Sequence, residues 1–160
     1  MQKIDSKIFL PINLEYSKSR DVICISSISD AVSRFFPEDV SRYVGWFLAA
    51  AKSRTKLDPL FDFHNRRGLF ALSQNLFDDV SRWLGISGKS IFDPLANSLA
   101  TAKYIRWTME KYKKIVPDEQ ERFLISFLSL DCGYFKIKKA MEKTLEPISF
   151  GKVKIFIKKL

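Results

Sequence analysis

Three points along this chain combine proline with an acidic residue directly ahead of a helical pattern. Pro37-Glu38-Asp39, Asp93-Pro94 and Pro117-Asp118-Glu119 each precede a stretch in which apolar residues recur every three or four positions. Proline fits the first turn of a helix, acidic side chains favour its positive end, and this spacing gives the helix one apolar face. The chain is therefore predicted to be mainly α-helical.

Length and composition fit one helical domain. The chain has 160 residues, of which 46% are hydrophobic and 14 are Phe, but it contains only six Gly and six Pro. A chain of this size buries about two thirds of the surface that its unfolded form exposes. The low glycine and proline content disfavours a sandwich rich in turns. We therefore expect one core that needs no disulfide or metal to hold it.

Capping residues and helix breakers predict where the helices begin and end. Pro59 should end the second helix near Lys56, because the residue before a proline avoids the α region. Gly85 and Gly133 should end two later helices. The predicted helices span about residues 29–36, 37–56, 73–84, 93–113, 117–132 and 134–143, with a final segment after Pro147.

Residues 1–26 differ from the rest of the chain. Apolar residues alternate with others from Ile8 to Leu14, and a β-branched run follows at Val22-Ile23-Cys24-Ile25. Alternation of this kind is typical of a strand, and Pro11, which lacks an N–H, would confine such a strand to an edge. Residues 1–26 are therefore predicted to form an extended arm or short hairpin, ahead of a helical domain over residues 27–160.

The net charge of +9 is concentrated near the carboxyl end of the chain. A basic surface favours an anionic partner, such as peptidoglycan with its carboxylates, nucleic acid or an acidic protein. The alternative is a solvated helix face that keeps a Phe-rich protein soluble. The lysines of this region are Lys136, Lys138, Lys139, Lys143, Lys152, Lys154, Lys158 and Lys159.

Other sequence signals are negative. Cys24 and Cys132 have no neighbour at metal-ligand spacing and His64 is the one histidine, so we expect free thiols, no metal and no cofactor. No run approaches the roughly 20 apolar residues of a membrane span. Charged residues stand near Met1 where a signal peptide would have its apolar segment, so no signal peptide is predicted.

Short motifs follow one another in a distinctive order over about residues 28 to 160. They are Leu57-Asp58-Pro59, Gly68-Leu69-Phe70, Trp83-Leu84-Gly85-Ile86, Asp93-Pro94-Leu95-Ala96-Asn97, Tyr104-Ile105-Arg106-Trp107, Ser129-Leu130-Asp131-Cys132-Gly133 and Ile137-Lys138-Lys139-Ala140-Met141. In this order they resemble the lytic transglycosylases, a branch of the lysozyme superfamily that cleaves peptidoglycan. The resemblance implies a lysozyme-like helical domain.

The catalytic residue of that family is a glutamic acid at the end of the helix before the Gly-Leu-Phe motif. Counting back from Pro59 places Arg54 there, and a slip of one residue places Ser53 or Thr55. A guanidinium does not release its proton in proteins, so Arg54 cannot act as a general acid. The resemblance therefore implies a fold without its catalytic acid.

A carboxylate from elsewhere in the cleft is the alternative acid. Asp58 and Asp62 lie in the loop after the second helix. The resemblance implies that Asp131 lies at the opposite wall of the cleft. Proton transfer requires such a group within about 3 Å of the glycosidic oxygen. If one of these aspartates has taken over, the chain is an active transglycosylase or muramidase.

The resemblance also implies the residues that contact a glycan strand. Trp107 has sugar stacking and core packing as alternative roles, and His64, Arg66 and Arg67 belong either to the cleft or to a solvated loop. Two departures weaken the match, because Ala71 replaces a glutamine and Leu130-Asp131 replaces a Tyr-Asn pair. The implied substrate-binding residues are Gly68, Leu69, Phe70, Tyr104, Asp131, Gly133 and Tyr134.

Three functions remain open, and the first is preferred. It is a degenerate lytic transglycosylase-like domain, inactive or weak, that serves as a structural or peptidoglycan-binding component of a larger assembly such as a phage tail or ejection apparatus. Residues 1–26 would contact other proteins of that assembly. The chain would be carried in a virion, or made in the cytoplasm and delivered to the cell wall or periplasm. The second function is an enzyme with a relocated acid, and the third is a basic helical nucleic-acid-binding protein.

Overall fold

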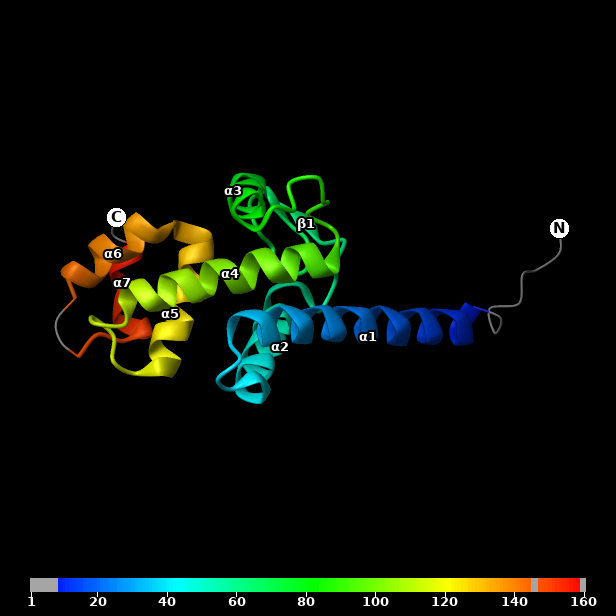
Figure 1. Ribbon diagram of the computed structural model, residues 1–160, viewed down its shortest axis with the longest axis horizontal. Coiled ribbons are helices and arrows are strands. Elements are labelled where there is room, and N and C mark those ends of the chain that lie inside the picture. Colours follow the sequence, from blue (N-terminus) through cyan, green and yellow to red (C-terminus); the bar gives the residue numbers. More distant parts are fainter. Residues whose placement is uncertain (1–8, 145–146, 159–160) are drawn as a thin grey trace.

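The computed structural model describes residues 9–144 and 147–158, and this part of the chain is mainly helical (Figure 1). A hairpin of two short strands lies between the second and third helices. The helices are α1 (Phe9–Phe35), α2 (Val40–Thr55), α3 (Gln74–Leu84), α4 (Pro94–Tyr112), α5 (Glu119–Cys132), α6 (Tyr134–Glu142) and α7 (Phe150–Ile157), and the strands are β1 (Asp62–Phe63) and β2 (Arg66–Arg67).

Side-chain caps begin five of these helices, including α7, where Ser149 accepts a hydrogen bond from the N–H of Lys152. The carboxylate of Asp93 accepts a hydrogen bond of 2.9 Å from the N–H of Ala96, and Asp39, Ser73 and Asp118 cap α2, α3 and α5 in the same way. Such caps satisfy N–H groups that have no partner inside the helix. The predictions for α3, α4 and α5 are confirmed.

The start of α2 differs slightly from the prediction. The helix begins at Val40, so Pro37 and Glu38 precede it instead of forming its first turn. Glu38 forms an ion pair with Arg106 of α4. This half-exposed carboxylate therefore links the segment before α2 to α4 at the surface, a role that its position in the sequence does not reveal.

The prediction of an extended arm is wrong for residues 9–26, which are helical and continuous with the short helix expected at 29–36. Residues 1–8 lie outside the described part of the chain. Pro11 falls in the first turn of α1, where its missing N–H has no intrahelical acceptor. Cys24, Ile28 and Val32 are fully buried at helical spacing, so packing of this face holds the β-branched run in a helix.

Helix α4 runs through the middle of the molecule, and the other elements pack around it (Figure 1). One long side of α4 contacts α1, which also contacts α2, while α3 and α5 pack on other parts of α4. The amino-terminal part of α1 projects beyond the body. Helices α6 and α7 pack on each other and on α5 at the opposite end of the molecule.

Aromatic rings fill the centre of the larger core, between α2 and α5. The Phe47 ring is nearly unexposed and has its centroid 5.5 Å from that of Phe36, 5.8 Å from Phe70, 5.4 Å from Phe123 and 5.4 Å from Phe127. Tilted and edge-on pairs at these distances are the preferred geometry of aromatic contacts. Phe47 therefore joins α2, α5 and the loop before α3.

A second, smaller core lies at the end of the molecule that carries α6 and α7. Its buried residues come from α4, α5, α6, α7 and the connection between α4 and α5. They are Tyr112, Val116, Ile125, Ile137, Ala140, Met141 and Val153. None of the helices in the described ranges is long and apolar enough to cross a membrane.

Candidate functional site

The Gly-Leu-Phe motif forms a tight turn between the hairpin and α3. Gly68 has φ of +74°, and a Cβ built on it would lie 2.3 Å from Asn97 Nδ2 and 2.3 Å from the carbonyl oxygen of Ile91. Both the left-handed backbone and the close neighbours exclude any other residue. Gly68 is therefore required by the packing of the turn against α4.

Polar side chains hold this turn from two helices. The amide of Asn97, fully buried in α4, accepts a hydrogen bond from Phe70 N (2.9 Å) and donates one to Ile91 O (2.9 Å). From α2, the hydroxyl of Thr55 donates to Leu69 O at 2.7 Å. The Gly-Leu-Phe and Asp-Pro-x-x-Asn motifs thus form one structural unit.

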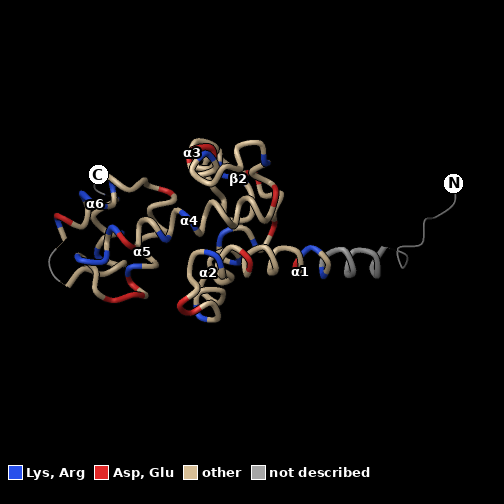
Figure 2. The backbone as a smooth tube through the Cα atoms, in the orientation of Figure 1, with Lys and Arg blue, Asp and Glu red and all other residues tan. Residues whose placement is uncertain are grey.

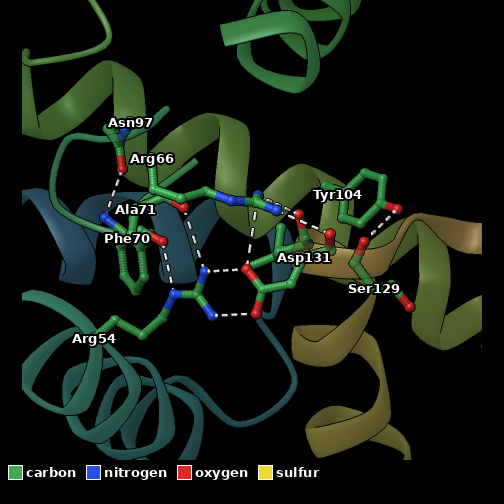
Figure 3. Close-up of polar contacts among 9 residues, drawn as sticks. Arg54, Arg66, Phe70, Ala71, Asn97, Tyr104, Ser129 and Asp131 are labelled. Atoms are coloured by element: carbon green, nitrogen blue, oxygen red, sulfur yellow. Dashed lines mark hydrogen bonds and ion pairs between the residues drawn. The ribbon is translucent and has the colours of Figure 1, made fainter. Parts of the chain in front are cut away.

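Arg54, at the end of α2, points toward this turn and toward the end of α5 (Figure 3). Its Nε donates to Phe70 O at 2.8 Å, and Nη2 donates to Ala71 O at 3.3 Å. Its two terminal nitrogens bind the two carboxylate oxygens of Asp131 at 3.0 and 2.7 Å. This bidentate ion pair ties α2, the turn and α5 together at one point.

Arg66, in β2, holds Asp131 from the other side. Its guanidinium donates to the backbone oxygens of Leu130 (2.9 Å) and Asp131 (2.8 Å), and it lies 3.6 Å from the Asp131 carboxylate. The last carbonyls of a helix have no partner inside the helix and carry its negative dipole end. Arg66 therefore caps the carboxyl end of α5 while placing a second positive charge beside Asp131.

The three alternative acids occupy different surroundings. Asp131 lies between two guanidinium groups, Asp62 pairs with Arg67 across the hairpin at 3.3 Å, and Asp58 accepts a hydrogen bond from the N–H of Leu60 at 3.0 Å. All three carboxylates are engaged with donors.

Several residues expected to contact a glycan are buried. Leu69 and Phe70 have no exposed surface, and Tyr104 is 6% exposed with its hydroxyl 3.3 Å from Ser129 O. In this structure these side chains pack in the core. Gly133 and Asp131 are exposed, and Tyr134 is half-buried beside them.

Aromatic side chains from α3, α4 and α6 form a continuous row that includes Tyr134. The ring centroid of Trp107 lies 5.9 Å from that of Trp83 and 4.9 Å from that of Tyr134. Trp83 is 56% exposed, whereas Trp107 and Tyr134 are half-buried. We call Trp83, Trp107 and Tyr134 the aromatic row. The sequence singled out Trp107 and Tyr134, but not Trp83 as their continuation.

A groove of about 570 Å³ opens on another face, between α2, α5 and α7. Its walls are mostly apolar, from Trp46, Phe123, Phe127 and Phe150, and Arg54 and Asp131 line part of it. The groove includes Asp131 but neither Asp58 nor Asp62. The residue at the expected catalytic position thus borders this groove, with its guanidinium bound to Asp131.

The remaining candidates are simpler. His64 lies exposed in the hairpin turn, where its ring contacts Phe63 edge-on. Cys24 and Cys132 are free thiols, and burial raises the pKa of both, so the prediction of unpaired cysteines is confirmed. Among the described residues, no group of three His, Cys, Asp or Glu side chains is placed to hold a metal ion.

Replacing Arg54 with methionine should lower the free energy of unfolding by about 2 kcal/mol. The change removes a bidentate pair and two hydrogen bonds to carbonyls while keeping the aliphatic contacts. Urea unfolding measures the loss. The matched control is Arg82→Met, since the pair of Arg82 with Asp79 is about two thirds exposed on both sides and should contribute less than about 0.5 kcal/mol. An equal loss in both variants would contradict a specific role for Arg54.

Tyr104 makes the stability depend on pH in the alkaline range. Burial raises the pKa of Tyr104 from 10.0 to about 12. A raised pKa means that the folded state disfavours the phenolate, so this contribution is complete below pH 10 and is lost as pH rises through 12. When the pH is raised from about 9 to about 11, the free energy of unfolding should fall in both proteins. The fall should be about 1 kcal/mol smaller for Tyr104→Phe than for the unchanged protein. Urea unfolding at the two pH values checks this, and equal losses would show that Tyr104 does not titrate with unfolding.

No protein-family model, no curated protein and no solved structure matches this chain.

Proposed function

We propose that this chain is a lysozyme-like domain related to the lytic transglycosylases, without their catalysis, that binds peptidoglycan glycan strands within a larger assembly. The observation that carries the proposal is the Arg54–Asp131 pair. It occupies the end of the helix where the resemblance expects a protonated glutamic acid, and its contacts at 2.7 and 3.0 Å use both oxygens of the nearest carboxylate.

The chemistry of glycoside cleavage explains why the Arg54–Asp131 pair disfavours catalysis. The leaving oxygen must receive a proton, and the transition state at the sugar carries positive charge. A guanidinium neither gives up its proton nor stabilises a positive centre beside it. Asp131, held by Arg54 and Arg66, is aligned as an ion-pair partner. The site therefore favours a structural role over a catalytic one.

Retention of the surrounding scaffold supports descent from such an enzyme. Gly68 and Asn97, from two separate motifs, interlock at distances that tolerate no larger residue at position 68. The turn they build still places Phe70 O and Ala71 O around the end of α2. These carbonyls receive the guanidinium of Arg54, so the turn lies beside the residue at which the resemblance expects the catalytic acid.

The aromatic row supports binding of a glycan. Sugar rings present apolar C–H faces that stack on aromatic side chains, and Trp83 offers more than half of its surface beside Trp107 and Tyr134. The net charge of +9 adds attraction to the carboxylates of peptidoglycan stem peptides. Together they favour an anionic glycan as the ligand.

The exposed face of α1 supports membership of a larger assembly. Val22 and Ile23 are 65% and 56% exposed, on the helix that projects beyond the body (Figure 1). Large apolar side chains that stay exposed on a helix are typical of protein interfaces. In the proposed assembly, a virion tail or an envelope-spanning complex, this helix binds a neighbouring protein and the aromatic row faces the wall.

The test is sedimentation of the purified protein with isolated peptidoglycan, followed by mass spectrometry of the soluble fraction. Binding without release of muropeptides is expected. Trp83→Ala should weaken binding by about tenfold, since a stacked aromatic ring contributes on the order of 1 to 2 kcal/mol. The matched control is Phe63→Ala, because Phe63 is similarly exposed at 61% but lies on the hairpin outside the row.

Two outcomes would overturn parts of this proposal. Release of anhydro-muropeptides that disappears in Asp131→Asn would identify Asp131 as a relocated acid and the chain as an active enzyme. Equal weakening by Trp83→Ala and Phe63→Ala, or no binding at all, would remove the aromatic row as a glycan site. Circular dichroism of each variant confirms that it is folded.

A further inference from the structure

Helix α6 exposes a large aromatic side chain among lysines. Phe135 is 82% exposed. Lys138 and Lys139 follow it at three and four positions, which places all three side chains on the same face of the helix. Lys136 is also exposed on α6, and Lys143 is exposed directly after its last residue. Figure 2 shows these positive segments gathered with those of α7 at one end of the molecule.

Helix α7 continues the same surface chemistry. Ile155 is 57% exposed, and Lys154 and Lys158 are exposed beside it. α6 and α7 pack on each other at this end of the molecule, and both carry exposed lysines there. Within the described residues of these two helices, Glu142 is the one acidic side chain. The combined surface is strongly positive and carries two exposed apolar side chains.

We propose that this face of α6 and α7, defined by Phe135, Lys138, Lys139, Ile155 and Lys158, binds the surface of an anionic lipid bilayer. Lysines attract acidic headgroups while exposed apolar side chains enter the interface between headgroups and acyl chains. The lysines and the apolar side chains act together. The lysines attract the face to the bilayer, and Phe135 then inserts into the interface, which a dissolved anion does not provide.

The composition of the face favours lipid over nucleic acid. Every cation from residue 123 to the end of the chain is a lysine, although arginine is the residue suited to bidentate contacts with phosphates and bases. Ile155 has no π face for a base to stack on. A diffuse lysine surface with aliphatic and aromatic exposure matches a fluid layer of headgroups.

Vesicle sedimentation tests the proposal with the full chain. The probes are vesicles of pure phosphatidylcholine and vesicles in which about one third of the lipid is phosphatidylglycerol. Binding is expected to the anionic vesicles alone and should weaken as salt rises from about 0.05 M to about 0.5 M. Free glycerol phosphate should not compete, because a single headgroup offers no interface for Phe135. Vesicles contain no glycan, so this result is independent of peptidoglycan binding.

Variants locate the face. Phe135→Ser should weaken vesicle binding by at least about fivefold, and Lys138→Gln with Lys139→Gln by about 25-fold, at about fivefold for each lysine. The matched control, Lys52→Gln with Lys89→Gln, removes the same charge from exposed lysines outside α6 and α7 and should have a much smaller effect. Trp83→Ala should leave vesicle binding unchanged.

Several outcomes would overturn the proposal. One is absence of binding to the anionic vesicles, and another is an equal effect of the two lysine pairs, which would assign binding to net charge. Insensitivity to Phe135→Ser would remove the apolar contact. Tighter binding to a DNA duplex than to the anionic vesicles at the same salt would identify nucleic acid as the partner.

Discussion

Gly68→Ala should lower the free energy of unfolding by about 3 to 5 kcal/mol, or prevent folding altogether. The added Cβ would lie 2.3 Å from both Asn97 Nδ2 and Ile91 O. Neither neighbour can move freely, because the Asn97 amide is buried and hydrogen-bonded to Phe70 and Ile91, and Ile91 O belongs to the backbone. The φ of +74° adds strain for any L side chain.

The control for this prediction is Gly88→Ala. Gly88 is exposed, and nothing lies within 4 Å of the position that its Cβ would take. Its replacement should change the free energy of unfolding by less than about 0.5 kcal/mol. Urea unfolding followed by circular dichroism compares the two. A loss for Gly68→Ala as small as that for Gly88→Ala would mean that α4 can move away from the turn. The inference that the two motifs form one rigid unit would then be wrong.

Phe47→Ala should lower the free energy of unfolding by about 3 to 5 kcal/mol, which is the range for removing a buried aromatic side chain. Phe47 lies on α2 and contacts rings from α5 and from the turn before α3, so the cavity left behind would be walled by elements that other contacts keep apart. The surrounding residues could close it only by moving whole helices. The thermal midpoint should fall by about 6 to 20 °C.

Phe63→Ala provides the comparison for Phe47→Ala. Phe63 is 61% exposed on the hairpin, and its replacement should change stability by less than about 0.5 kcal/mol. Calorimetry of both variants measures the difference. A loss for Phe47→Ala close to that for Phe63→Ala would show that the aromatic cluster is loosely packed.

Local interactions made the helix boundaries predictable. Ser73, Asp93 and Asp118 each cap a helix by binding an N–H group three residues ahead, so the signal lies within one turn of the chain. Gly85 adopts positive φ at the end of α3 for a reason that is equally local. The helical class and most boundaries could therefore be predicted.

Longer-range packing explains where the predictions failed. The β-branched run at Val22 to Ile25 has the composition of a strand, but burial of Cys24 with Ile28 and Val32 against α2 and α4 favours a helix. The role of Arg66 as a cap of α5 also had no local signal, because its acceptors lie 64 and 65 residues further along the chain.

The candidate site shows the same division between local and distant contacts. From the sequence, Arg54 was expected at the end of α2 and Asp131 was considered as a replacement acid. Only the folded chain brings the two together, across 77 residues, into a bidentate pair. The sequence alone therefore did not indicate that the Asp131 carboxylate is the ion-pair partner of Arg54.

The sequence by itself determined the helical class, the helix caps and the absence of a carboxylic acid at position 54, because each depends on residue identity or on neighbours within one helical turn. Tertiary structure decided the helical state of residues 9–26, the burial of Leu69, Phe70 and Tyr104, and the pairing of Arg54 with Asp131. These features depend on which distant segments share the core. Burial and ion pairing arise from such contacts, so a local sequence pattern does not predict them.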